Sequence, residues 1–144
     1  MQIRAAFSED LDVIRTLLTN NQLAASDVHA SLLDNFLVAE SEDGALVGSI
    51  GLERFGQDAL LRSLVVARSA CDMGLAGSLV SRMELHARAS GVSNLWLLTT
   101  TAGEFFRKKG YEVVARESAP IMLQTSSQFA DLCPATAVCM LKWL

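Results

Sequence analysis

Apolar residues recur with the 3.6-residue period of amphipathic helices in two segments of the chain. Residues 11–18 place their leucines and isoleucine on one face, and Ser8 before them is a suitable N-cap. Residues 75–86 repeat apolar positions at spacings of three and four, and the glycine at position 91 suits a C′ position. The pattern therefore predicts two amphipathic helices, the second ending near residue 90.

Shorter runs rich in β-branched and aliphatic residues predict strands between and after these helices. We expect strands over residues 3–6, 36–40, 46–55, 60–66, 95–98, 111–115 and 135–144. Shorter helices are expected over residues 26–32 and 104–109, and another from Ser126 or Ser127 to 132. A turn at 56–59 would make strand 60–66 antiparallel to strand 46–55, so that Glu53 faces Arg62. Gly48 and Gly51 indicate a bulge or a close approach of another group to the backbone.

The segment 60–80 combines a strand, a loop of small residues and a helix. The first N–H groups of a helix have no partner within it, and the aligned peptide dipoles add partial positive charge there. Gly74 and Gly77 would let a ligand approach the backbone closely. The segment thus predicts a site for a phosphate or pyrophosphate. A plain turn before a packing helix is the alternative.

The residues Cys71-Asp72-Met73-Gly74-Leu75-Ala76 resemble the acetyl-CoA loop of the GCN5-related N-acetyltransferases (GNAT), Gln/Arg-x-x-Gly-x-Gly/Ala. Cys71 stands where that family usually has Arg or Gln, and Asp72 stands where Gly is common. Phe105-Phe106-x-x-x-Gly110-Tyr111 is similar to the family's Ala-x-x-Phe-Tyr-x-x-x-Gly-Phe pattern. The resemblance spans about residues 3–114. The block LLRSLVV and the tail SSQFADLCPATAVCMLKWL look like the branch found in arsenic-resistance clusters.

The resemblance implies an α/β fold of the GNAT type. Its mixed sheet would have mostly antiparallel N-terminal strands, splayed fourth and fifth strands, and helices on both faces. Acetyl-CoA would be the co-substrate and no metal would be needed. An N–H near Val65 would bind the thioester oxygen, and pantetheine would run along residues 64–66. The implied cofactor-binding residues are Leu64, Val65, Val66, Cys71, Asp72, Met73, Gly74, Leu75, Ala76, Gly77, Thr99, Thr100, Phe105 and Phe106.

Transfer of an acetyl group from a thioester to an amine needs a base for the amine and an acid for the thiolate. Relatives carry a carboxylate two residues before the arginine, but here that position is Leu60, so Glu53 is the candidate base. A plain salt bridge between Glu53 and Arg62 is the alternative. Phe106 occupies the family's tyrosine position and has no proton to give, so water, Ser63 or a threonine would act as the acid.

Arg62 suggests an acceptor with an anionic group, because an arginine fork binds a carboxylate, phosphinate or arsonate through two hydrogen bonds. If Glu53 is only structural, His29 and Asp27 are the next candidate bases by residue type. Tyr111 is expected in the core and His86 is interpreted as a packing residue. Cys71 is interpreted as passive, although a helix N-terminus can activate a thiol. The expected acceptor is therefore a small, amino-acid-like amine.

Composition narrows the class of protein. A chain of 144 residues is expected to form one domain, 1–144. The net charge of −4 and the lack of a basic run argue against nucleic acid and anionic membranes as partners. Hydrophobic content of 51% and a mean hydropathy of +0.30 suggest a homodimer. Three cysteines and two histidines fit neither a disulfide framework nor a zinc site, and no leader or apolar span is evident.

A cytoplasmic N-acetyltransferase is thus the main prediction. A non-catalytic CoA-binding or sensor domain of the same fold is the second hypothesis, since Cys71, Asp72 and Phe106 depart from the family pattern. A structural dimer module is the third, and it rests only on the apolar tail. Turnover of acetyl-CoA with any amine would separate the first hypothesis from the others.

Overall fold

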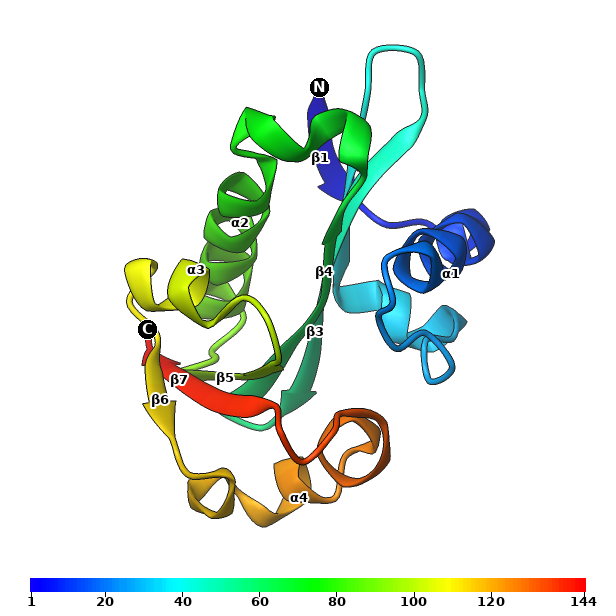
Figure 1. Ribbon diagram of the computed structural model, residues 1–144. Coiled ribbons are helices and arrows are strands. Elements are labelled where there is room, and N and C mark those ends of the chain that lie inside the picture. Colours follow the sequence, from blue (N-terminus) through cyan, green and yellow to red (C-terminus); the bar gives the residue numbers. More distant parts are fainter. The chain divides into compact units, whose positions relative to one another are not determined.

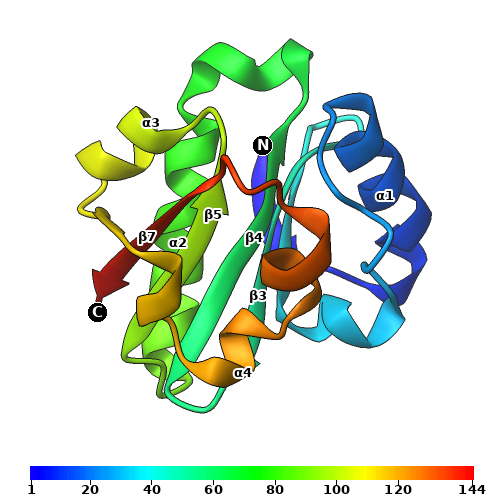
Figure 2. The same ribbon diagram turned by 60° about the horizontal axis from the view of Figure 1, so that its bottom comes forward.

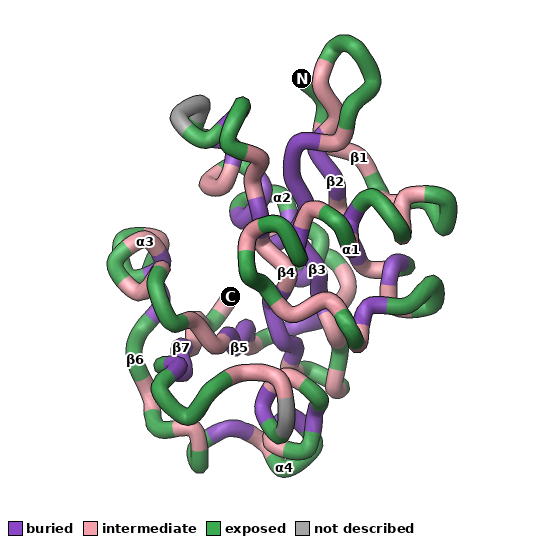
Figure 3. Tube along the Cα trace, turned by 45° about the vertical axis from the view of Figure 1, so that its right-hand side comes forward, coloured by how far each residue is buried: buried purple, intermediate pink, exposed green. Residues whose placement is uncertain are grey.

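The computed structural model describes residues 1–71, 74–130 and 132–144 (Figure 3). Seven strands hydrogen-bond in the order β1-β2-β3-β4-β5-β7-β6. The β1/β2, β2/β3, β5/β7 and β6/β7 pairs are antiparallel, and β4/β5 is parallel. The strands are β1 (Gln2–Ala5), β2 (Phe36–Glu40), β3 (Leu46–Phe55), β4 (Asp58–Val66), β5 (Asn94–Thr99), β6 (Glu112–Val114) and β7 (Val138–Trp143).

The predicted mixed α/β fold is confirmed, since helices alternate with these strands. The α-helices are α1 (Leu11–Asn20), α2 (Leu75–Ala89), α3 (Gly103–Lys108) and α4 (Ile121–Gln124). Shorter helical turns are η1 (Ser8–Asp10), η2 (Ala30–Asn35), η3 (Arg68–Met73), η4 (Arg116–Ser118) and η5 (Gln128–Leu132). In the described part of the chain no helix is long and apolar enough to cross a membrane.

The chain divides into two compact units. The first comprises Met1–Glu53 and Arg62–His86, and the second comprises Arg54–Leu61 and Ala87–Leu144. Strands β3 and β4 and helix α2 contribute residues to both units. The expectation of a single domain stays a prediction.

In the first unit, β1 to β3 and the end of β4 lie between helices on both faces, with α1 on one side and α2 on the other (Figure 1). The α1 face buries Ile14, Leu18, Val28, Leu33, Phe36, Val38 and Val65. On the opposite face Gly48 lies against α2, because a Cβ there would come within 3.1 Å of Leu79 Cδ1. A Cβ on Gly51 would lie 2.3 Å from the Phe36 ring. The predicted close approach at both glycines is confirmed.

In the second unit, α4 and η5 cover one face of the strands (Figure 2). Their core comprises Leu60, Trp96, Ala119, Leu123, Phe129 and Cys139. Asp58 fixes the start of β4, because its Oδ1 accepts hydrogen bonds from Trp96 Nε1 at 2.9 Å and Asn94 Nδ2 at 3.1 Å. A parallel strand pair is thereby tied by side chains as well as by main chain.

Several predicted boundaries were wrong for local reasons. Strand β4 begins at Asp58, so the loop after β3 is only Gly56–Gln57, with Gly56 at φ +72°. Counting outward from that tight loop makes Glu53 and Arg62 diagonal neighbours rather than directly opposite. Ser8 does not cap the first helix; Asp10 Oδ2 instead accepts the Phe7 N–H at 2.7 Å. The helix predicted at 26–32 is η2, and α4 had no clear signal in the sequence.

Candidate active site

An irregularity in β4 shapes the centre of the candidate site. Ser63 has φ +57°, a left-handed conformation that is uncommon for a residue with a side chain. The buried Ser49 Oγ on β3 donates to Ser63 O at 2.8 Å and holds this irregularity, called the bulge below, in place. The β4/β5 ladder comprises Asp58 to Leu60 with Asn94 to Trp96, and β4 continues beyond it to Val66. The expected splay of these two strands stays a prediction.

The main chain that follows the bulge, residues 64–66, is the segment expected to bind the thioester and pantetheine. Val65 is buried, whereas Leu64 and Val66 are half-buried. The β4/β5 register from Asp58 to Leu60 includes none of these three residues. An extended ligand that pairs with a strand needs main-chain donors and acceptors.

The loop after β4 ends in the glycine that the sequence singled out. Gly74 has φ +69°, and a Cβ added to it would meet no neighbouring atom within 4 Å, so backbone conformation rather than crowding favours glycine. Helix α2 starts at Leu75, and its first intrahelical bond runs from Ser78 N to Gly74 O at 3.2 Å. The N–H groups of Leu75, Ala76 and Gly77 therefore lie in the first turn of α2, the part of a helix where main-chain N–H groups lack an intrahelical partner. The cofactor assignments to Asp72 and Met73 fall outside the described residues.

Arg62, on β4 immediately before the bulge, lies at the centre of a buried ion network. Its Nη1 and Nη2 donate to the two oxygens of Asp27, both at 2.6 Å, and Nη1 also donates to Glu53 Oε1 at 3.1 Å. Its Nε donates to Ser63 Oγ at 3.2 Å. The side chain of Arg62 is only 1% exposed, against 15% for Asp27 and 26% for Glu53. The two catalytic candidates are thus in contact, and Asp27 joins them.

Electrostatics favour a charged arginine in this network. Burial lowers the pKa of Arg62, but the hydrogen bonds and charges of Asp27 and Glu53 outweigh it and raise the pKa overall. A buried guanidinium stays charged at any physiological pH. The predicted salt bridge between Glu53 and Arg62 is confirmed.

Sequence reasoning undervalued Asp27, because it lies 35 residues from Arg62 in the chain. It belongs to the segment between α1 and η2, where Val28 is fully buried and its carbonyl accepts from Arg15 Nε at 2.7 Å. An aspartate in a polar segment carries no periodic signal that would reveal such a partner. Its residue type alone makes it a candidate base, to be considered if Glu53 is only structural.

The candidate residues in the second unit differ from one another in exposure and in contacts. Thr99 Oγ1 accepts the Ala102 N–H at 3.0 Å, and Thr100 is exposed. Phe106 is buried edge-to-face against Phe105 and Tyr111, with ring centroids 5.0 and 5.4 Å apart. Tyr111 is 1% exposed, so its predicted core position is confirmed.

The remaining histidines and cysteines lie elsewhere. His86 is exposed and its Nε2 contacts Asn35 Oδ1 at 3.3 Å, so its interpretation as a packing residue was wrong. His29 is exposed and contacts Ser31. Cys71 is exposed, whereas burial raises the pKa of the Cys139 thiol to about 11. Within residues 1–71, 74–130 and 132–144 no three His, Cys, Asp or Glu side chains form a group that could hold a metal ion.

Comparison with known proteins agrees with this architecture. Residues 33–113, more than half of the chain, match the family described as the acetyltransferase (GNAT) domain. The chain is 28% identical over 127 residues to an amino-acid acetyltransferase of Neisseria meningitidis serogroup A, covering 83% of this chain and 29% of that protein. An amino-acid acetyltransferase of Aeromonas salmonicida is 28% identical over 131 residues, covering 85% and 29%. The chain therefore spans under a third of these relatives.

Solved structures show the same fold. N-acetylglutamate synthase from Neisseria gonorrhoeae, complexed with coenzyme A and N-acetyl-glutamate, matches with a TM-score of 0.86 and 24% identity. That match covers 99% of this chain and 35% of the synthase. Rv2747 from Mycobacterium tuberculosis, in complex with CoA and NLQ, matches with a TM-score of 0.83 and 21% identity over 100% and 99% of the two chains. The family match covers more than half of the chain, so the chain belongs to the GNAT acetyltransferase family.

Proposed function

We propose that this domain transfers the acetyl group of acetyl-CoA to the amine of a small, amino-acid-like acceptor, by direct attack in a ternary complex. The observation that carries the proposal is the bulge at Ser63, followed within one strand and loop by the open N-terminus of α2. Family membership supports the reaction class. The names of the relatives, amino-acid acetyltransferases, support the acceptor class.

In this proposal the main chain holds the co-substrate. The thioester oxygen accepts a hydrogen bond from an N–H near Val65, and pantetheine extends along Leu64 to Val66. The pyrophosphate lies at the N–H groups of Leu75 to Gly77, because the partial positive charge of a helix N-terminus attracts its negative charge. The assignment of Thr99, Thr100, Phe105 and Phe106 to co-substrate binding stays a prediction. Both matched structures named above contain coenzyme A, which supports this choice of co-substrate.

Chemistry then needs two proton transfers. Glu53 takes a proton from the acceptor's ammonium, directly or through water, and the amine nitrogen attacks the thioester carbon. The C–S bond breaks as the amide forms; the nitrogen gives its second proton to water or a hydroxyl, and that group in turn protonates the thiolate leaving group. Ser63 is the hydroxyl nearest the bulge, whereas Phe106 can donate none. A phosphinate or organoarsenical acceptor is a narrower proposal that rests only on LLRSLVV and the tail.

The co-substrate assignment is tested by titrating acetyl-CoA into the protein by calorimetry. Gly74→Asp adds a negative charge at the proposed phosphate position, and we expect at least a tenfold loss of affinity, about 1.4 kcal/mol. Gly74→Asn is the matched control, because Asn and Asp tolerate a positive φ similarly but Asn carries no charge. Equal affinity in wild type and Gly74→Asp would remove the cradle from the proposal.

A CoA-binding sensor is the second candidate. Phe106 occupies the position of the family's usual acid and is buried against Tyr111, so this position supplies no proton, which favours a sensor. Release of the CoA thiol in the presence of an amine panel separates the two candidates: the enzyme releases it and the sensor only binds. A homodimer in the cytoplasm remains part of the proposal, supported by exposed Trp143, Ile121 and Met122. Sedimentation at micromolar concentration tests the dimer.

A further inference from the structure

Most N–H groups of the Arg62 guanidinium already donate within the protein, so few remain for a substrate. A guanidinium has five N–H groups. Two donate to Asp27, one to Glu53 and one to Ser63, so four of the five are used within the protein. The pair of N–H groups that a substrate carboxylate would grip is already gripped by the carboxylate of Asp27, at 2.6 Å on both oxygens.

The exposure of the three side chains also argues against a substrate carboxylate bound to Arg62. The Arg62 side chain is 1% exposed, whereas Asp27 and Glu53 are 15% and 26% exposed. A molecule that approaches this network therefore meets carboxylate oxygens before it meets the guanidinium. With one cation and two anions, the network carries a formal charge of −1, which attracts an ammonium and repels a carboxylate.

Asp27 is also anchored against displacement. Next to it, the fully buried Val28 donates its N–H to Ala25 O at 3.1 Å and accepts from Arg15 through its carbonyl at 2.7 Å. An incoming carboxylate would have to break two charge-assisted hydrogen bonds of Asp27 and move this packed segment. Removing one partner of a buried ion pair is costly, so such an exchange is unfavourable.

The network adjoins the reacting position of the proposed function. Arg62 directly precedes Ser63, whose positive φ marks the bulge, and Arg62 Nε donates to Ser63 Oγ. Residues 64–66, proposed to bind the thioester, follow on the same strand. A charge preference here would act on the acceptor.

Resting on the proposed function, we propose that this network selects the acceptor by its ammonium group, and that Asp27 sets this preference by occupying Arg62. The ammonium is received by Glu53 beside Asp27, and Arg62 is a positioning residue that holds both carboxylates. The acceptor class is then a small amine for which a free carboxylate next to the amine is not required. This proposal differs from the sequence-based interpretation of Arg62 as the anion-binding residue, which needs an Arg62 fork open to the acceptor.

The test compares acceptors that differ only in the carboxylate: L-leucine with L-leucinamide, and L-glutamate with its α-amide. Rates are expressed per concentration of free base, because the amide lowers the pKa of the amine. We expect kcat/KM to be at least tenfold higher for each amide. A tenfold preference for the free acids, abolished in Arg62→Lys, would overturn the inference while leaving the transferase assignment intact.

Variants separate positioning from plain stability. Asp27→Asn removes one negative charge and frees part of the Arg62 fork, so we expect the amide preference to fall about tenfold, mainly through KM. Asp10→Asn, the same substitution against Arg4, is the matched control and should leave the preference unchanged. An unchanged preference in Asp27→Asn contradicts the inference.

Binding gives a readout that does not depend on turnover. Leucinamide and leucine are titrated into the complex with CoA, which lacks the acetyl group. Tighter binding of leucinamide supports the inference even if no amine is acetylated, in which case only the transferase assignment fails. Equal or tighter binding of leucine, or binding of neither, overturns the inference.

Discussion

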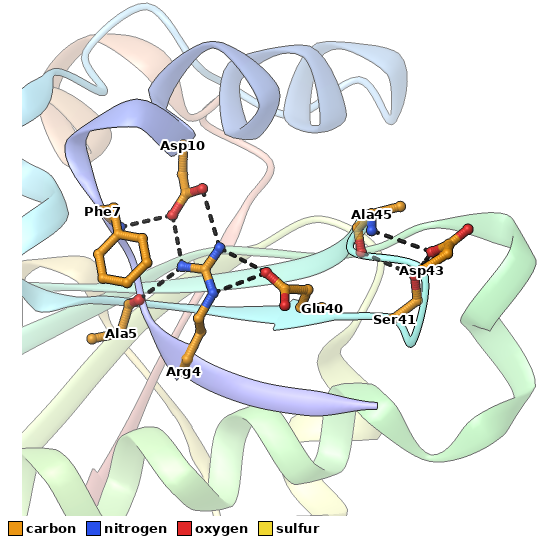
Figure 4. A network of polar contacts seen from close by, with 8 residues as sticks. All are labelled: Arg4, Ala5, Phe7, Asp10, Glu40, Ser41, Asp43 and Ala45. Carbon is orange, nitrogen blue, oxygen red and sulfur yellow. Dashed lines mark hydrogen bonds and ion pairs between the residues drawn. The ribbon is translucent and has the colours of Figure 1, made fainter.

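Two ion networks in the first unit have the same composition, one arginine between two carboxylates, yet they differ in burial and reach. Arg4 donates to Asp10 at 2.9 Å and to Glu40 at 3.0 Å (Figure 4). It also donates to Ala5 O and lies 4.5 Å from the centre of the Phe7 ring. Its side chain is 18% exposed, against 1% for Arg62.

The Arg4 network joins neighbours. Gln2 pairs with Glu40 across β1 and β2, so Arg4 lies diagonally from Glu40. Asp10 is only six residues away in sequence, and it also accepts the Phe7 N–H before α1. Its bonds account for a structural role, fixing β1 to β2 and starting the first helix.

The Arg62 network joins distant segments beside a bulge. Asp27 is 35 residues away in sequence, and Ser63 next to Arg62 has a strained φ. Strained backbone and buried charge together cost stability and are frequent at functional sites. The comparison teaches that the composition of an ion network does not reveal its role, whereas burial and the neighbouring backbone do.

The largest expected effect is on stability. Arg62→Met leaves two partly buried carboxylates without their cation, and we expect a loss of about 3 kcal/mol in the free energy of unfolding. Arg4→Met disrupts a more exposed network, and we expect about 1 kcal/mol. Urea unfolding monitored by circular dichroism measures both. Equal losses would remove the distinction between the two networks.

A smaller effect is expected in acid. The hydrogen bond from Arg4 lowers the pKa of Asp10, helped by the Phe7 N–H and opposed by burial. A lowered pKa stabilises the fold above the ordinary aspartate pKa, and this contribution disappears as pH falls through the folded-state pKa. Asp10→Asn should therefore cost about 1 kcal/mol at pH 7 and progressively less below pH ~4.

Urea unfolding of wild type and Asp10→Asn over this pH range provides the measurement. Asp12→Asn, an exposed change in the first turn of α1, is the control and should alter stability by only a few tenths of a kcal/mol. A cost of Asp10→Asn that is constant with pH would show that the Arg4 pair contributes nothing to the acid sensitivity.

Local patterns predicted much of this fold. The strand Leu46–Phe55 has the predicted bounds, and Gly91 has φ +94° after α2, because alternation and glycine conformation are local properties. The contact between Glu53 and Arg62 was predictable from a hairpin, although the loop is shorter than expected.

Non-local features escaped prediction. The pairing of Asp27 with Arg62 depends on how the segment before η2 packs against β3 and β4, which no spacing encodes. The exposure of His86 was missed because its position continues an apolar stripe, yet the end of that stripe is not covered. The short α4 lacks a periodic pattern, since one helical turn is too short to show one.

The central claim is that the Arg62 network, and not the Arg4 network, takes part in proton transfer from the acceptor. It is tested most directly by the pH–rate profiles of Glu53→Gln and Glu40→Gln, which remove a carboxylate from the Arg62 and the Arg4 network, respectively. Glu53→Gln should lower kcat by about 100-fold at neutral pH and recover as the amine loses its proton in alkali, because only a base is missing. Glu40→Gln should keep the wild-type profile. A wild-type profile for Glu53→Gln, or equal changes in both variants, would contradict the account.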